Sequence, residues 1–242
     1  MSSRRWPRRA RLAERGGPQV IPRPAAAEPG PPAPWAHLPS SARHIDVARV
    51  ARGLHAVGPP ERISWDAPEG ARRSAVLAPI FDENAAAWVV LTRRSQHLRT
   101  HKGQVSFPGG RQDPGETLIE AALREAREEI ALDTRDIEIV GELDHIEMLT
   151  SDSSIVPFVG VLPGRPATYT PNPAEVEAVI DVALDELVQD DVFRAELWPM
   201  RWSTEDAEVR PMYFFDLYGD TIWGATARML VNLLSVALGV DH

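Results

Sequence analysis

The sequence predicts an α/β domain built in layers. Short apolar runs, which are typical of buried strands, alternate with two amphipathic stretches that are long enough to be helices. The first stretch runs from about Glu116 to Ala131, and the second closes the chain at Ala225 to Leu238. Strands interspersed with a few helices indicate that sheet and helices pack against each other around one core.

The composition is that of a globular protein with one domain and extensions, at 242 residues, 43% hydrophobic and 25% charged. The absence of cysteine excludes disulfides and thiol catalysis, so a reducing cytoplasm is the expected compartment. No apolar run reaches about 18 residues, and we therefore expect no membrane span. The net charge of −9 argues against general affinity for nucleic acid.

Residues 1–39 are predicted to be a disordered tail. The segment 1–23 carries a net charge of +6, which leaves −15 for the rest of the chain. The segment 23–39 is rich in proline and alanine and has little apolar surface to offset the entropy lost on ordering. An organellar targeting peptide and an arm for an anionic partner are alternatives, although prolines interrupt the helix that a targeting peptide needs.

The segment 40–69 is predicted to hold one helix and a linker. Ser40 or Ser41 could cap a helix over His44 to Ala56, whose apolar positions suit packing on the outside of the domain. The domain itself is expected to span residues 70–242. Its predicted strands are 74–80, 88–92, 137–143, 154–161, 175–182 and 209–218, with a short helix at 183–188. Pro157 requires a bulge or an edge position within its strand.

The helix near 116–131 gathers three carboxylates on one face. At about 100° per residue, Glu125, Glu128 and Glu129 fall within roughly a quarter of the circumference. Like charges at these spacings destabilise a helix, so a positive group is expected on that face. Carboxylates without cysteine or histidine at ligand spacing suit Mg²⁺ or Mn²⁺, and a solvated acidic face is the alternative. The predicted apolar face consists of Ile119, Ala122, Leu123, Ala126 and Ile130.

The spacing around these glutamates resembles the Nudix box, GX5EX7REUXEEXGU, in which U is aliphatic. Gly110 and Glu116 are followed by the run Arg124 to Glu129, and every charged position of the pattern is matched. One position departs, because Ala131 stands where the family has glycine. A left-handed turn there costs alanine on the order of 1 kcal/mol, so either the turn tolerates the strain or the helix ends differently.

The residues upstream are similar to the signature of the coenzyme A pyrophosphatase branch of the Nudix hydrolases. The signature comprises Leu91–Ser95, Arg99, Gly103 and Phe107–Gly110. The resemblance implies an αβα sandwich with a mixed central sheet and a catalytic loop-helix. It also implies cleavage of coenzyme A or its derivatives to 3′,5′-ADP and 4′-phosphopantetheine or the acyl form, and it suggests a homodimer.

The resemblance also assigns roles. It makes Glu125 and Glu129 the first ligands of Mg²⁺ or Mn²⁺, and Glu128 a further ligand or the group that orients water. Arg124 would brace the glutamates, and Glu116 would stabilise the junction of loop and helix.

Four residues are predicted to bind substrate. Arg94 and Arg99 are candidates for holding phosphates, with a surface charge or a brace to an acid as the alternative. Gly109 and Gly110 would let the backbone approach phosphate oxygens or make tight turns.

The general base is not fixed by the sequence. Glu175 or Glu177 could supply it, although a half-exposed strand carboxylate can equally be solvated. Two other functions stay open at this point: a Nudix hydrolase for another nucleoside diphosphate derivative, such as ADP-ribose, and a catalytically silent module that binds coenzyme A.

Overall fold

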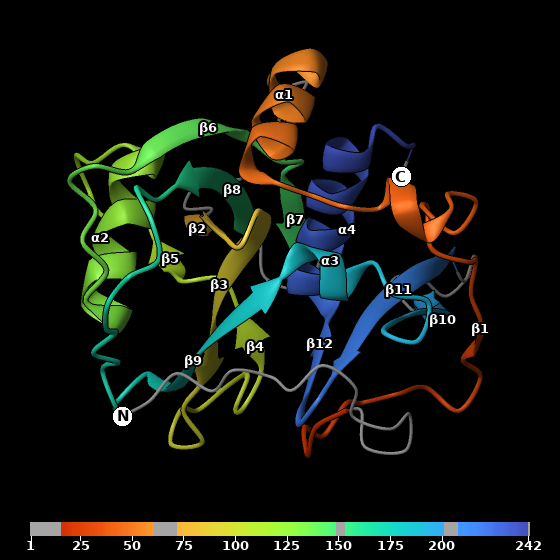
Figure 1. Cartoon of the computed structure of the whole chain (residues 1–242). Helices are drawn as coiled ribbons and strands as arrows, with labels where there is room; N and C mark the ends of the chain where they lie inside the picture. Colours follow the sequence, from red (N-terminus) through yellow and green to blue (C-terminus); the bar gives the residue numbers. More distant parts are fainter. Residues whose placement is uncertain (1–15, 61–71, 149–152, 201–207, 242) are drawn as a thin grey trace.

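The computed structural model describes residues 16–60, 72–148, 153–200 and 208–241 (Figure 1). None of the helices in these ranges is long and apolar enough to cross a membrane. The helices are α1 (Val47–Val57), α2 (Leu118–Ile130), α3 (Leu184–Leu187) and α4 (Gly224–Leu238), with a 3₁₀ turn at Ser40–Ala42. The strands are β1 (Glu28–Pro29), β2 (Arg72–Glu83), β3 (Ala86–Arg94), β4 (Val105–Ser106), β5 (Gly109–Arg111), β6 (Glu138–Glu142), β7 (Ile146–Met148), β8 (Ser153–Val161), β9 (Val176–Ala183), β10 (Phe193–Met200), β11 (Glu208–Leu217) and β12 (Asp220–Trp223).

The larger sheet is mixed, as the sequence predicts for the central layer. Its path is β4-β3-β2-β8-β6, and β5, β7 and β9 pair with β2, β8 and β3 respectively. The long contact between β2 and β8 is parallel, whereas the other pairings in this sheet are antiparallel. Pro157 lies in β8 opposite the break between β6 and β7, so its missing N–H falls where the ladder is already interrupted.

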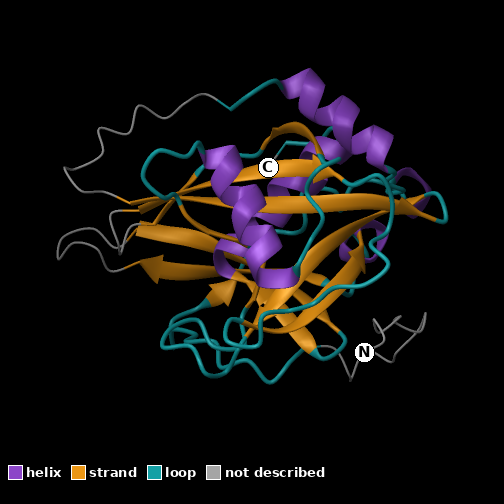
Figure 2. Ribbon diagram, turned by 90° about the vertical axis from the view of Figure 1, so that its left-hand side faces the viewer, coloured by secondary structure: helices purple, strands orange, loops and turns teal. Residues whose placement is uncertain are grey.

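Helices cover both faces of this sheet, which confirms the layered α/β architecture. Helix α2 packs on β2 and β5, and in Figure 2 it faces the viewer and lies across the strands. Helices α1 and α4 pack together on the opposite side (Figure 1). The inward-facing residues predicted for the closing helix are all buried there: Met229, Leu230, Leu233, Leu234 and Ala237. Each face thus has its own apolar cluster.

A second sheet, ordered β1-β10-β11-β12, contradicts part of the predicted tail. The edge strand β1 pairs with β10, and Trp35 is only 1% exposed where it packs against the rings of Phe193 and Phe215. The prediction of disorder for residues 1–39 is therefore wrong for residues 16–39. This segment needs no apolar core of its own because it packs against residues of β10 and β11. Residues 1–15 lie outside the described part of the chain.

Helix α1 forms close to its predicted range but with a different cap. The side chain of Asp46 accepts a hydrogen bond from the backbone N–H of Arg49, so neither Ser40 nor Ser41 caps the helix. Val50 and Leu54 are buried, and α1 packs against α4 and β6. The expected linker continues through residues 61–69, which lie outside the described ranges.

Helix α2 is fixed at its start by a reciprocal cap. The Thr117 hydroxyl accepts from the N–H of Glu120, and the Glu120 carboxylate accepts from the N–H of Thr117. This capping box satisfies two backbone donors that the first turn leaves free. Ala121, Ala122, Ala126 and Ile130 face the sheet. The predicted inward position of Ile119 is wrong, since it is 37% exposed.

The end of α2 shows how the chain manages without the family glycine. Ala131 adopts the left-handed conformation at φ 54° and ψ 36°, and its N–H still bonds back to Arg127 O at 2.9 Å. The N–H of Leu132 reaches Ala126 O, which closes the turn. Ala131 therefore adopts the left-handed conformation expected of the family glycine, with the steric strain that this conformation causes in alanine.

Replacing Ala131 with glycine is expected to stabilise the protein by about 0.5 kcal/mol. The relief of left-handed strain, about 1–2 kcal/mol, outweighs the roughly 0.4–1 kcal/mol cost of a freer unfolded chain. Urea unfolding of Ala131→Gly measures the change. Ala48→Gly on the exposed side of α1 is the control and should cost about 1 kcal/mol. Equal destabilisation by both variants would contradict the strain at Ala131.

Candidate functional site

The three glutamates of α2 lie in three different environments. Glu129 is buried, Glu125 is mostly buried with its side chain 16% exposed, and Glu128 is largely solvent-exposed. Helical geometry explains this gradient, because Glu129 lies on the buried side of α2 and Glu128 lies about 100° away from it around the helix. The acidic face predicted from the sequence is therefore buried at Glu129 and exposed at Glu128.

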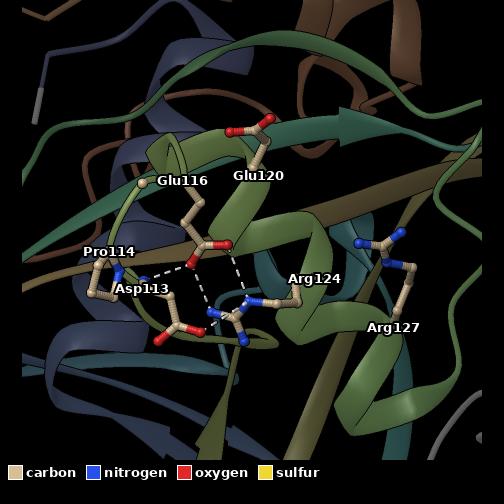
Figure 3. A pocket seen from close by; sticks show the side chains of 7 residues that line it. Asp113, Pro114, Glu116, Glu120, Arg124 and Arg127 are labelled. Atoms are coloured by element: carbon tan, nitrogen blue, oxygen red, sulfur yellow. Dashed lines mark hydrogen bonds and ion pairs between the residues drawn. The ribbon is translucent and has the colours of Figure 1, made fainter.

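Arg124 holds this face together. Its guanidinium contacts Glu125 at 2.8 Å and Glu128 at 3.2 Å, and it binds Glu116 through two nitrogens at 2.8 and 3.1 Å. Figure 3 shows the pairing of Arg124 with Glu116 across the turn that leads into the helix. The hydrogen bond from Arg124, with a further one from the Asp113 N–H, lowers the pKa of Glu116. Arg124, expected to brace the glutamates, and Glu116, expected to stabilise the junction of loop and helix, thus belong to one network of ion pairs.

Glu129 is an acid in an unfavourable setting for its charge. Burial raises its pKa to about 8, against the partly compensating charge of Arg94 and the N–H of Gly109. That N–H lies 3.4 Å from the carboxylate and is its single hydrogen-bond donor among the described residues. Burial also raises the pKa of Glu125, which Arg124 partly offsets. A cation placed beside both groups would restore their charged forms.

The donor set fits a hard divalent cation in its chemistry. It offers carboxylate oxygens, one of them on a buried side chain with too little compensating charge. As the side chains stand, no three histidine or acidic residues of the described ranges are already gathered at metal-binding distance. Glu125 and Glu128 instead point to Arg124, so metal binding would require them to turn from this partner.

Gly109 and Gly110 have packing reasons to be glycine. A Cβ on Gly109 would lie 2.4 Å from Ala75 O on the paired strand β2, and Gly109 has a φ of 156°. A Cβ on Gly110 would lie 2.4 Å from the Glu125 carboxyl carbon. The missing side chains therefore let β5 approach both β2 and the acidic face of α2.

The loop from Arg94 to Gly103 carries the predicted phosphate-binding arginines. Arg94 ends β3, and backbone hydrogen bonds with Gly103 and Gln104 close the loop beneath it. Arg94 is partly buried and its charge acts on Glu129, whereas Arg99 is exposed on the loop. Within the described ranges neither guanidinium makes an ion pair, so neither acts as a brace to an acid.

A shallow pocket of about 460 Å³ lies beside this network and does not include the acidic face. Asp113, Pro114, Gly115, Glu116, Glu120, Arg124 and Arg127 line it (Figure 3). Glu125, Glu128 and Glu129 are not among these residues. We therefore regard this hollow as the outer side of the loop-helix junction, separate from the candidate metal ligands.

The segment between β8 and β9 covers the end of α2, which the sequence did not reveal. The N–H groups of Thr170 and Asn172 donate to the carbonyls of Ile130 and Glu129 at 3.0 and 2.8 Å. They satisfy two carbonyls that the last turn of a helix leaves free. The segment thereby fixes the backbone of Glu129.

A buried carboxylate anchors this covering segment. Asp181 on β9 accepts a hydrogen bond from the Tyr169 hydroxyl at 2.9 Å and an ion pair from Arg165 at 3.0 Å. The alternating pattern of β9 predicts a half-exposed acid at this position, but Asp181 is only 6% exposed. No local signal in the sequence distinguishes it from its exposed neighbours.

Comparison with known proteins agrees with this arrangement. The NUDIX domain family model matches residues 71–201. Nudix hydrolase 3 of Caenorhabditis elegans is 41% identical over 117 residues, 48% of this chain and 49% of that protein. Nudix hydrolase 22, chloroplastic, of Arabidopsis thaliana is 39% identical over 176 residues, 68% of this chain and 55% of that protein.

A bacterial relative matches over more of its length. The uncharacterized Nudix hydrolase NudL of Photorhabdus laumondii is 34% identical over 176 residues, covering 72% of this chain and 88% of that protein. The chain thus spans about half the length of the first two relatives and most of the third. Since the family model covers more than half of the sequence and includes the whole loop-helix, the chain belongs to the Nudix family.

Proposed function

We propose that this protein is a Mg²⁺- or Mn²⁺-dependent hydrolase that cleaves the pyrophosphate bond of coenzyme A or one of its derivatives. The products would be 3′,5′-ADP and 4′-phosphopantetheine or its acyl form. One observation carries the proposal: the positive charge of Arg94, at the end of β3, acts on the buried carboxylate of Glu129 on α2. A cation for phosphate and an anion for metal are the charges that pyrophosphate cleavage needs in one place.

Glu125 and Glu129 are the first candidates to hold the metal, with Glu128 as the third. Glu129 is held in place by burial and by the covering segment, while Glu125 and Glu128 form ion pairs with Arg124. A bound ion would neutralise phosphate charge and polarise the phosphoryl oxygens. Arg124 offsets the repulsion between Glu125 and Glu128 and holds Glu125 where its carboxylate lies against Gly110.

The substrate part of the proposal rests on the motif of residues 91–110. Coenzyme A carries a diphosphate and a separate 3′-phosphate, so two arginines at different positions suit it. We assign the diphosphate to Arg94, because its charge acts on Glu129, and the 3′-phosphate to Arg99, which is exposed further along the loop. The cytoplasmic location and the homodimer stay predictions from the sequence.

Two alternatives differ from this proposal in their outcome with substrate. A Nudix hydrolase for another nucleoside diphosphate derivative, such as ADP-ribose, would use the same α2 glutamates without needing Arg99. A silent module would bind coenzyme A without cleaving it. The complete set of charged box positions favours an active enzyme over the module.

Purified protein with Mg²⁺ is expected to hydrolyse coenzyme A in preference to 3′-dephospho-coenzyme A and ADP-ribose. Replacing Arg94 with alanine should lower kcat/KM for all three by about 10–100-fold, the effect of losing a charge-assisted hydrogen bond. Arg99→Ala should affect only the substrate with the 3′-phosphate. Arg127→Ala, which removes an exposed arginine of α2, is the control. Product identification by mass spectrometry checks the bond cleaved, and turnover of ADP-ribose alone would refute the substrate assignment.

Glu129→Gln is expected to remove metal-dependent activity by more than about 100-fold while preserving the fold, since even residues that only orient metal ligands cost 10–100-fold. Mg²⁺ and Mn²⁺ titrations followed by thermal unfolding should show that the variant loses metal-induced stabilisation. Near-normal turnover in this variant would contradict a metal-binding role for Glu129.

The same variant should change the pH dependence of stability in the absence of metal. The folded-state pKa of Glu129, about 8, lies above its ordinary value of 4.5. Its favourable contribution is therefore complete below about pH 4.5 and is lost as the pH rises through 8, by at most about 1.4 kcal/mol per pH unit. Urea unfolding in EDTA should show this loss in the wild type and in the exposed control Glu138→Gln, but not in Glu129→Gln.

A further inference from the structure

We infer that Glu175 is the catalytic carboxylate that orients the attacking water and accepts its proton, and that Glu177 is not. This inference rests on the proposed hydrolase function. Glu175 is the last residue before β9, where the covering segment meets the arginine loop. Three observations carry the assignment: its backbone contacts, its unpaired side chain and the bulge that separates it from Glu177.

Backbone hydrogen bonds place Glu175 between the two parts of the site. Its carbonyl accepts from the N–H of Ser95 at 2.8 Å, directly after Arg94. Its N–H donates to Asn172 O at 3.0 Å, and the N–H of Asn172 in turn donates to Glu129 O at 2.8 Å. Glu175 is thus tied on one side to the arginine loop and, through Asn172, on the other side to the glutamate helix.

The negative charge of Glu175 acts on the acidic side of α2. Although burial is the main reason that the pKa values of Glu125 and Glu129 are raised, the negative charge of Glu175 contributes to both. The side chain is partly exposed and, within the described ranges, makes no ion pair or hydrogen bond. A carboxylate whose charge reaches this face, and whose oxygens have no partner among the described residues, is available to bind water.

A bulge in the β3–β9 ladder directs Glu177 elsewhere. Arg93 pairs with Ala178 and Arg94 with Val176, so Glu177 is the extra residue of β9. Bulges of this kind re-aim a side chain. Glu177 lies 3.5 Å from Arg93, whose guanidinium also binds the buried Asp220. Its charge is therefore used in a structural ion-pair network.

The covering segment that carries Glu175 is firmly held. Asp181 binds Tyr169 and Arg165, and the Asn172 side chain accepts from the Ala174 N–H at 3.2 Å. Such an anchored backbone limits the motion of Glu175 to its own side chain. A positioned side chain is what proton transfer in a transition state requires.

The chemical step balances with Glu175 in this role. The water oxygen forms a bond to phosphorus as the bond from that phosphorus to the bridging oxygen breaks. The leaving phosphate keeps the electron pair of the broken bond. The water proton passes to the Glu175 carboxylate and then to solvent, which returns the enzyme to its starting state.

Steady-state kinetics of Glu175→Gln and Glu177→Gln with coenzyme A and Mg²⁺ test the assignment. Glu175→Gln is expected to lower kcat by about 10²–10⁴-fold, the usual contribution of a general base. KM and the stabilisation of the protein by Mn²⁺ should stay near wild type, which a merely structural defect would not allow. Glu175→Asp should recover part of the rate, and Glu177→Gln should match the wild type. Circular dichroism checks that each variant is folded.

The outcomes separate the two proposals. A wild-type protein that cleaves none of the diphosphates would overturn both. A wild-type protein that cleaves one of them, together with an equally active Glu175→Gln, would overturn only the role of Glu175. Loss of Mn²⁺ stabilisation in Glu175→Gln would also overturn it, because the residue would then be a metal ligand.

Discussion

Repulsion among the carboxylates of α2 is the constraint around which this site is built. Glu125, Glu128 and Glu129 occupy neighbouring positions on one face, where like charges destabilise a helix. Two arginines from different parts of the chain oppose that repulsion: Arg124 contacts Glu125 and Glu128, and the charge of Arg94 acts on Glu129. Arg124 does so by direct ion pairs, whereas Arg94 acts on Glu129 without pairing with it among the described residues.

The helix that carries these charges is held at both ends by contacts outside its own hydrogen-bond ladder. The capping box at Thr117 fixes its start, while Thr170 and Asn172 satisfy carbonyls at its end. The strained Ala131 directly follows the last residue of the helix. With the backbone fixed at both ends, adjustment to a ligand is left to the glutamate side chains. A fixed backbone with movable side chains suits a site in which Glu125 and Glu128 are paired with Arg124 before a ligand binds.

The sequence predicted the elements whose signals are local. Helix α2, the strands β2, β3, β8 and β9 and the closing helix α4 each have a clear apolar period. Trp35 was missed because its partners lie on strands more than 150 residues away, and nothing near it signals burial. Strands β10 and β12 were missed as well, since Phe193–Met200 mixes charged residues with proline and tryptophan, and Asp220–Trp223 is very short.

Within the site, the box pattern predicted which glutamates share a face and that Arg124 would brace them. It could not separate Glu175 from Glu177, because the bulge that turns them apart arises from pairing between two strands. The burial of Asp181 was not predicted for a similar reason. The residues that cover it belong to the segment before β9 and not to the strands that pair with β9. The period of apolar residues in one helix or strand predicts which of its faces can be buried. Its pairing with other parts of the chain decides which residues cover that face.

The burial of Trp35 and of α4 also bears on how this domain can be divided. The family model ends at residue 201 and begins at residue 71, so both features lie outside it. Yet α4 covers one face of the assembly, and Trp35 fills the aromatic cluster of the second sheet. The segment with the chemistry therefore shares its core with both flanks. Transplanting it alone into another protein would leave apolar surface uncovered, and the flanks would have to travel with it.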